Sequence, residues 1–111
     1  MASTFKVKTS RDIGNTLTSV GSYTVPAATT TTVIGLSLAN TITQSVSADV
    51  TVYDGANDTY LVKNVLIPKG STLVVVGGEQ KVVLETGYTV KVRSTDANSI
   101  DAVLSVLELT S

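Results

Sequence analysis

The sequence predicts an all-β protein, a single antiparallel β-sandwich of about seven or eight strands with an immunoglobulin-like or a jelly-roll-like arrangement. Three observations support this prediction. The 111 residues include 18 Val and 18 Thr, whose β-branched side chains fit a pleated sheet. Apolar and polar residues alternate with a period of two in several stretches, and the sequence has no helical periodicity of useful length. Gly, Pro, Asn and Asp separate these stretches, as turns between strands require.

The N-terminal stretch, 1–21, is rich in Ser, Thr and Asn and is predicted to be either an arm or a first strand followed by a long loop. Chain termini are ordered only where they are tied down, so both alternatives stay open. Residues 22–111 are predicted to form the β-sandwich domain. The N-terminal stretch contains a short alternating piece and a small basic cluster, made of Phe5, Lys6, Val7, Lys8 and Arg11.

Two long strands are predicted next. Val33 to Asn40 places Ile34, Leu36 and Leu38 on one face and small residues on the other, which form either a solvated face or a surface for close approach. Val46 to Tyr53 alternates so that its valines face the core, while Ser47, Asp49, Thr51 and Tyr53 face water. The loop Asp54 to Asp58 then returns the chain into Tyr60 to Ile67, which predicts a hairpin.

The stretch Ile67 to Val92 contains three further runs that resemble strands. Pro68-Lys69-Gly70 predicts a tight turn before the first of them. The runs Leu73–Val76 and Val82–Leu84 flank Gly77 to Gln80, and the apolar pattern predicts that they pair with each other as a hairpin. That register would place Val75 opposite Val82 and Leu73 opposite Leu84. The turn Glu85-Thr86-Gly87 leads into the alternating strand Tyr88 to Ser94.

The last predicted strand, Ile100 to Leu109, carries apolar residues on both faces, including Leu107 and Leu109. Such a strand is predicted to be central in its sheet or to be covered by another chain. The mean hydropathy of +0.30 is also high for a lone small sandwich. Together these features favour burial of apolar surface in a homo-oligomer, with a trimer as one arrangement.

The residue types argue against an enzyme, a metal site and a cofactor. The chain has no His and no Cys, which excludes histidine-based triads, cysteine nucleophiles and the usual zinc sites. The loop Asp54 to Asp58 offers hard oxygen ligands, but it lacks the EF-hand spacing and has the residues that a hairpin turn needs. Tyr53, Tyr60 and Tyr88 are predicted to cap the core, with a carbohydrate-binding surface as the alternative.

Charge and hydropathy limit the classes of binding partner that the sequence predicts. The net charge is −1 with 15% charged residues, so we expect no binding to nucleic acid. No apolar run approaches the length of a membrane span, and the N-terminus lacks the apolar region of a signal peptide. We therefore expect a soluble, unprocessed protein that does not bind membranes.

Thr31 to Leu109 resembles small β-sandwich proteins that are structural components of tailed bacteriophage particles. The resemblance is carried by the segments LVKNVLIPKGSTLVVVGGEQKVVLETGYTVKV and SIDAVLSVLEL. It implies a virion protein without catalysis, made in the cytoplasm of a bacterial host. The protein would be a capsid decoration (cement) protein that binds the major capsid protein, or an accessory protein of the neck, tail or fibre. The candidate subunit contacts are Phe5, Lys6, Lys8, Arg11, Pro68, Lys69, Gly77, Gly78, Leu107 and Leu109.

Overall fold

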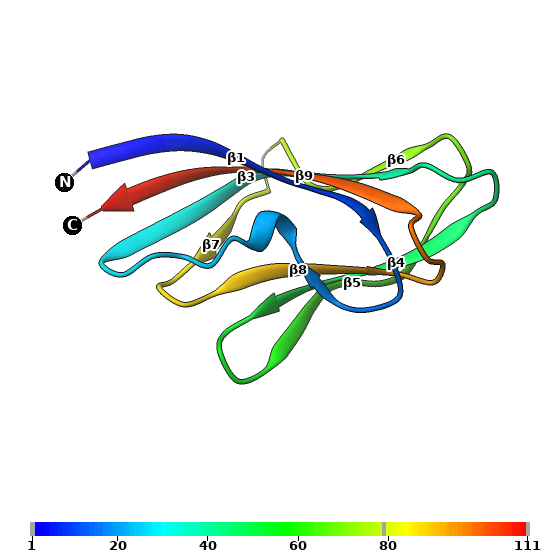
Figure 1. Ribbon diagram of the computed structural model, residues 1–111. Coiled ribbons are helices and arrows are strands. Elements are labelled where there is room, and N and C mark those ends of the chain that lie inside the picture. Colours follow the sequence, from blue (N-terminus) through cyan, green and yellow to red (C-terminus); the bar gives the residue numbers. More distant parts are fainter. Residues whose placement is uncertain (1, 79, 111) are drawn as a thin grey trace.

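The structure, a computed structural model, describes residues 2–78 and 80–110 and consists of two antiparallel sheets packed face to face (Figure 1). This confirms the predicted antiparallel β-sandwich. A short 3-10 helix, η1 (Val20–Ser22), follows the second strand. The described residues form nine strands: β1 (Ala2–Ile13), β2 (Thr18–Ser19), β3 (Thr29–Asn40), β4 (Val46–Tyr53), β5 (Asp58–Ile67), β6 (Thr72–Val76), β7 (Val82–Leu84), β8 (Thr89–Ser94) and β9 (Ile100–Thr110).

The strand order is that of a jelly roll rather than an immunoglobulin-like sandwich. The five-stranded sheet has the order β1-β9-β3-β6, with β7 also paired to β3, and the four-stranded sheet has the order β2-β8-β4-β5. The pairs β1 with β9, β2 with β8, β3 with β6 and β7, and β4 with β5 are those of one long antiparallel ribbon rolled into two sheets. The N- and C-terminal strands therefore lie side by side, and both ends of the chain lie at one end of the molecule (Figure 1).

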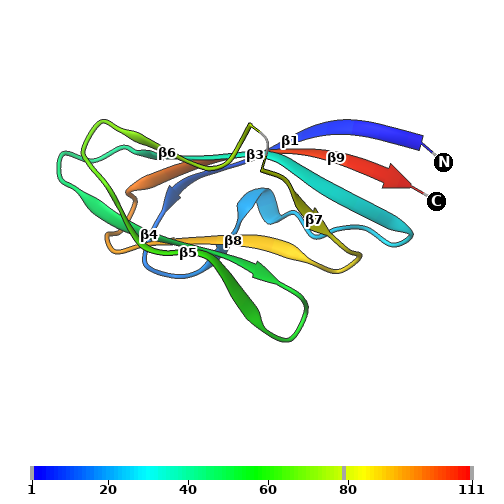
Figure 2. The same cartoon turned by 180° about the vertical axis from the view of Figure 1, so that it is seen from behind.

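The predicted hairpin between Leu73–Val76 and Val82–Leu84 is wrong. Both segments pair antiparallel with β3, β6 with Leu36–Ala39 and β7 with Thr31–Val33. The chain leaves the edge of β3 after β6 and returns to the same edge in the same direction, so β6 and β7 are two parts of one interrupted strand (Figure 2). The apolar pattern of each short run fits either partner, and β3 is long enough, at 12 residues, to pair with both. This interruption also brings the strand count to nine.

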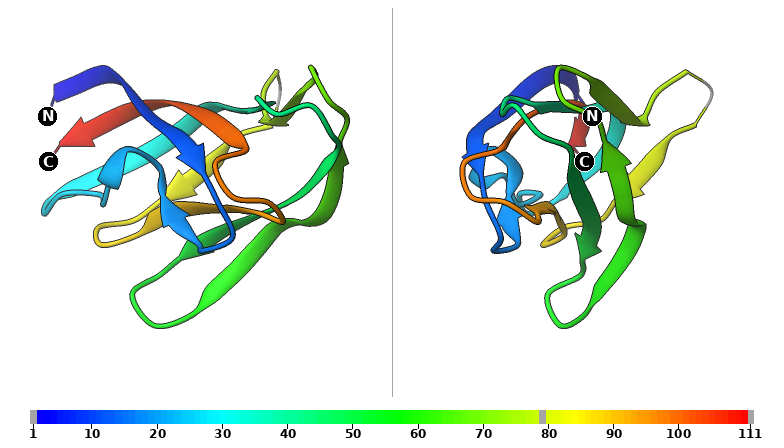
Figure 3. Two further views of the ribbon diagram at one scale, coloured as in Figure 1. Left: turned by 45° about the vertical axis from the view of Figure 1, so that its right-hand side comes forward. Right: turned by 90° about the vertical axis from the view of Figure 1, so that its right-hand side faces the viewer.

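Two other predictions about pairing are confirmed. Strand β9 is central, because β1 pairs along one of its edges and β3 along the other. Strands β4 and β5 form a hairpin that closes with Tyr53 opposite Asp58, and its tip extends away from the rest of the molecule (Figure 3). The turn after Ile67 also forms: the Ser71 amide donates to the Pro68 carbonyl, and Gly70 adopts a φ of 71°.

Residues 2–13 form the edge strand of the five-stranded sheet, paired with β9 from Ala2 opposite Thr110 to Ile13 opposite Ile100. The pairing shifts by a bulge between Ser10 and Ile13. Ala2–Ile13 is thus the first strand of the five-stranded sheet in chain order.

The core fills the space between the two sheets. Burial of apolar side chains here supplies about 1.5–3 kcal/mol for each fully buried Val, Leu or Ile. The five-stranded sheet contributes the larger side chains and the four-stranded sheet contributes mainly valines. Core residues that are at most 1% exposed include Val33, Leu36, Leu38, Leu84, Ile100, Leu104 and Val106 from the first sheet and Val46, Ala48, Val50, Val90 and Val92 from the second.

Three predicted side-chain environments are wrong. Asp49 and Thr51, predicted to face water, are 3% and 0% exposed. Asp49 forms an ion pair with Arg93 and accepts a hydrogen bond from the Asn64 amide at 2.7 Å, so neighbouring strands cover it. The alternation predicts that Ile34 faces the same way as Leu36 and Leu38, but β3 has a bulge between Val33 and Gly35 that breaks this alternation. Ile34 consequently lies on the outside of the sheet.

Candidate functional site

The outer face of the five-stranded sheet is the most distinctive surface of the molecule. Its position follows from the register: Phe5 pairs with Leu107, Leu107 with Thr32, and Thr32 with Val83, so these four side chains form one row across the sheet. The adjacent row contains the buried Val106 and Val33 and faces the core. We call the residues of the outward rows the outer face: Ser3, Phe5, Val7, Thr9, Thr30, Thr32, Ile34, Gly35, Ser37, Ala39, Thr72, Val74, Val83, Val103, Ser105, Leu107 and Leu109.

This outer face carries most of the exposed apolar side chains. Among the described residues, eight large apolar side chains are exposed, and six of them belong to the outer face: Phe5 (73%), Val7 (61%), Val74 (62%), Val83 (60%), Val103 (45%) and Leu109 (38%). The other two, Tyr60 and Leu66, lie on β5 in the opposite sheet. Small monomeric proteins rarely gather so many apolar side chains on one face, and such a patch marks an interaction site.

The outer face is hollowed near its centre. A depression of about 370 Å³ is lined by Phe5, Lys6, Val7, Ile34, Ser105 and Val106. The β3 bulge places Ile34 beside it, and the paired residues Gly35 and Ser105 are small enough to leave the space open. Phe5, which is the most exposed large apolar side chain described, stands at its rim.

Charge separates the two broad faces of the sandwich. The outer-face residues named above are all uncharged, and the outward row of β9 has one charged residue, Asp101, at the start of the strand opposite Ala39. The four-stranded sheet instead carries Lys63, Lys91 and Arg93. An uncharged apolar face opposite a charged face suits a subunit that is covered on one side.

The structure gathers only part of the predicted contact set. Phe5, Leu107 and Leu109 lie together on the outer face, whereas Lys6 and Lys8 lie on the inner side of β1. Arg11 is exposed near the end of β1. The remaining candidates occupy two turns: Pro68 and Lys69 are exposed in the turn before β6, and Gly77 and Gly78 follow β6, with Gly77 beside Val74 of the outer face.

Sequence reasoning missed five of the eight large apolar residues of the outer face. These are Val7, Ile34, Val74, Val83 and Val103. The alternation of β1 and β9 carried a signal for Val7 and Val103, because each shares a strand face with a predicted contact. Val74 and Val83 could not be placed without knowing that β6 and β7 both border β3, and Ile34 depends on the bulge.

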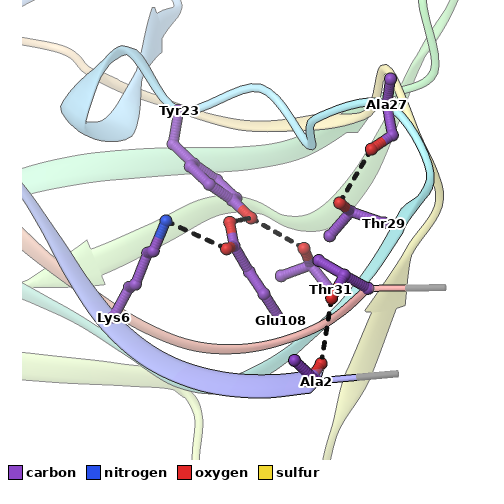
Figure 4. A network of polar contacts seen from close by, with 8 residues as sticks. Ala2, Lys6, Tyr23, Ala27, Thr29, Thr31 and Glu108 are labelled. Carbon is purple, nitrogen blue, oxygen red and sulfur yellow. Dashed lines mark hydrogen bonds and ion pairs between the residues drawn. The ribbon is translucent and has the colours of Figure 1, made fainter.

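Lys6 belongs to a polar network between β1, β9 and the segment after η1 (Figure 4). Lys8 contacts the same network through the ring of Tyr23. The Tyr23 hydroxyl donates to Glu108 Oε2 at 2.6 Å, and Lys6 Nζ lies 3.1 Å from Glu108 Oε1. Because the single Tyr23 proton is used in this way, Thr31 must donate its hydroxyl to Tyr23 at 2.7 Å. Lys8 Nζ lies 5.5 Å from the centre of the Tyr23 ring.

The network shifts the pKa values of both buried groups. Burial, together with the hydrogen bond to Glu108, raises the pKa of Tyr23 to about 12. The hydrogen bond from Tyr23 lowers the pKa of Glu108, with help from Lys6 and against the effect of burial. Since the pKa of Glu108 is lower in the folded protein, its carboxylate stabilises the fold above the ordinary carboxyl pKa. That stabilisation is lost as the pH falls through the folded pKa. The network is therefore a structural clamp that fixes β1 and β9 to Tyr23.

Tyr53, Tyr60 and the Asp54 loop, which the sequence offers as candidates for a carbohydrate or an ion, have partners within the chain. Lys91 Nζ lies 3.8 Å from the centre of the Tyr53 ring, and Lys63 Nζ lies 4.3 Å from that of Tyr60. Asp54 Oδ1 accepts hydrogen bonds from the amides of Ala56 and Asn57, which lower the pKa of Asp54. These contacts are those of a self-stabilised turn.

Within residues 2–78 and 80–110, no three carboxylates approach closely enough to hold a metal ion. The same part of the chain contains no helix with the length and hydropathy needed to cross a membrane.

Comparison with known proteins supports the fold. No protein-family model and no curated protein gave a significant match to the sequence. Among solved structures, a pilus protein of Bacillus endospore appendages aligns with a TM-score of 0.58 and 12% identity, over 98% of this chain and 87% of that one. An infectious bursal disease virus protein aligns with a TM-score of 0.49 and 8% identity, over 98% of this chain and 33% of that one. A protein of the extra small virus of the giant freshwater prawn aligns with a TM-score of 0.47 and 12% identity, over 100% of this chain and 82% of that one. At this level of identity, the pilus likeness shows a shared two-sheet β fold.

Proposed function

We propose that the protein is a non-catalytic structural subunit of a virus particle, and that it acts as a capsid decoration protein in the virion. In this role it stabilises the head through contacts between subunits, and the outer face supplies the main contact surface. The energy would come from burial of apolar surface, at about 25 cal/mol for each Å² removed from water.

The observation that carries this proposal is the uncharged, apolar outer face on an otherwise ordinary small sandwich. Six exposed apolar side chains on one face are costly for a protein that works alone, because they promote nonspecific association. The same side chains are useful in a subunit that spends its lifetime packed against others. The jelly-roll topology agrees with this role, since viral capsid proteins commonly use it, although the fold by itself does not establish a function.

The likeness to a pilus protein also agrees with an assembly role, and this chain would assemble differently. The related structure is described as part of disulfide-linked pili. The present chain contains no cysteine and so cannot form such a link. Its subunits would be held by noncovalent contacts, in which an extensive apolar face is the available source of affinity.

An accessory role in the neck, tail or fibre would use the same surface, and the location in the particle distinguishes it from decoration of the head. A carbohydrate-binding module has less support. Two of its candidate rings, Tyr53 and Tyr60, have lysine side chains over them, and Asp54 caps its own turn.

Binding to shells tests the proposal. Shells assembled from the major capsid protein of the same virus are mixed with the purified chain and sedimented. We expect the wild-type chain to pellet with the shells and to raise the temperature at which they dissociate. A chain that stays in the supernatant, and that peptide mass spectrometry does not detect in purified particles, would refute the proposed function.

A further inference from the structure

We propose that the outer face binds a second copy of this chain, so that two five-stranded sheets pack face to face around a two-fold axis near Phe5 and Val7. This inference rests on the proposed use of the outer face as a contact surface, and it names the partner. It also predicts a pair as the basic unit of assembly, rather than the trimer considered from the sequence.

Charge is the first reason to choose a second copy. In a two-fold contact, each patch meets an identical patch, so a charged face would place like charges together. The residues named as the outer face are uncharged, and the one charged residue of the outward row of β9, Asp101, lies at the start of the strand, four residues from the Ser105 that pairs with Val7. Lys6, which borders the hollow, is already paired with Glu108 on the inner side of β1. A partner with a strongly charged surface would find no complement on this face.

Shape is the second reason. The outer face presents both a projecting group and a space to receive one, and they lie next to each other. Phe5 is 73% exposed, and the depression beside it is shallow and open, with a volume of about 370 Å³ against which an aromatic ring could pack. A two-fold axis between them would insert Phe5 of each copy into the hollow of the other. Since Phe5 and Val7 also line the hollow, both residues would lie close to the axis.

The available area is sufficient for a stable pair. Strand β9 has 11 residues, which gives the sheet a length of about 36 Å at about 3.3 Å per residue. The path β1-β9-β3-β6 is four strands wide, about 19 Å at the usual strand spacing. The face therefore measures about 700 Å² per copy, close to the roughly 800 Å² that each partner buries in a standard stable interface.

Pairing through the edge of β1 is the competing arrangement for two copies, and the structure disfavours it. Edge strands that avoid pairing carry inward-pointing charges and bulges. β1 has both features: Lys6 and Lys8 point to the inner side, and the strand has a bulge between Ser10 and Ile13.

Sedimentation velocity over a range of concentrations tests the inference. We expect the wild-type chain to form a dimer, and both Phe5→Ala and Val7→Lys to raise the dimer dissociation constant at least about tenfold. Leu66→Lys is the matched control, because Leu66 is as exposed as Val7, at 61%, but lies on the opposite sheet. It should leave the dimer unchanged. Thermal melting of each variant at low concentration verifies that the monomer still folds.

A charge-swap experiment gives the decisive readout. Val7→Lys and Val7→Glu should each fail to associate alone, and an equimolar mixture should form a heterodimer because the two position-7 side chains lie near the axis. A wild-type chain that is monomeric or trimeric, or a dimer that tolerates Phe5→Ala and Val7→Lys, would overturn the inference. Those results would not affect the shell-binding test, which could still support the proposed function. A dimer that never associates with shells would refute the proposed function and leave the dimer inference standing.

Discussion

Replacement of Leu104 by alanine is expected to lower the free energy of unfolding by about 2–5 kcal/mol. Leu104 is fully buried at the middle of the central strand β9, where it pairs with Leu36 of β3. Removing its side chain would leave a cavity between the two sheets that the surrounding valines and leucines cannot fill completely. Urea unfolding followed by circular dichroism at low protein concentration measures the effect.

Val103→Ala is the matched control for Leu104→Ala. Val103 is the adjacent residue on the same strand, but it points to the outer face and is 45% exposed. Its loss should cost less than about 1 kcal/mol in the monomer, since much of its surface is already in water. Equal effects of the two substitutions would mean that β9 does not have one face in the core and one outside.

Replacement of Tyr23 by phenylalanine is expected to cost about 1–3 kcal/mol, because it removes a donor from a buried carboxylate. Tyr23 is 6% exposed and Glu108 is 5% exposed, so water cannot freely replace the lost hydrogen bond. The pKa of Glu108 should rise at the same time, since the hydrogen bond from Tyr23 is the main cause of its lowered value. The variant should therefore lose less stability than the wild type on acidification from about pH 7 to about pH 3.

Tyr53→Phe controls for the loss of a tyrosine hydroxyl as such. The Tyr53 hydroxyl donates to the Gly55 carbonyl at 3.0 Å in an exposed loop, where water can take over the hydrogen bond. We expect a cost below about 0.5 kcal/mol and an unchanged acid dependence. Chemical denaturation at several pH values compares the two variants. If Tyr23→Phe behaved like Tyr53→Phe, the clamp between β1, β9 and Tyr23 would contribute nothing to stability.

The fold class was predictable because it depends on local features, such as apolar alternation and turn residues, that are visible in short stretches of sequence. The alternation of Val46 to Tyr53 and the loop Asp54 to Asp58 were enough to predict the β4–β5 hairpin. The two apolar faces of Ile100 to Leu109 were enough to predict a central strand. In each of these cases the deciding information lies within about twenty consecutive residues.

The pairing of β6 and β7 could not be predicted in the same way. Each of these two strands could pair either with the other or with β3, which lies about forty residues earlier in the sequence. The local apolar pattern does not distinguish these two partners. The composition of the outer face depends on this pairing, since Val74 and Val83 belong to the face only because β6 and β7 pair with β3. The burial of Asp49 and Glu108 was also not predicted, because a charged residue is expected to face water. Their burial is explained by partners distant in sequence, which are Arg93 for Asp49 and Lys6 and Tyr23 for Glu108.

Solvent protection of the outer face is the most direct test of the account as a whole. Because the chain has no cysteine, Val103→Cys and Leu66→Cys each introduce a single reactive thiol, one on the outer face and one on the opposite sheet. The rate of maleimide labelling is measured in dilute monomer and in assembled protein. We expect assembly to slow labelling of Val103→Cys at least about tenfold and to leave labelling of Leu66→Cys unchanged. Equal labelling rates of Val103→Cys in both states would show that the outer face stays open to water, and would contradict the account.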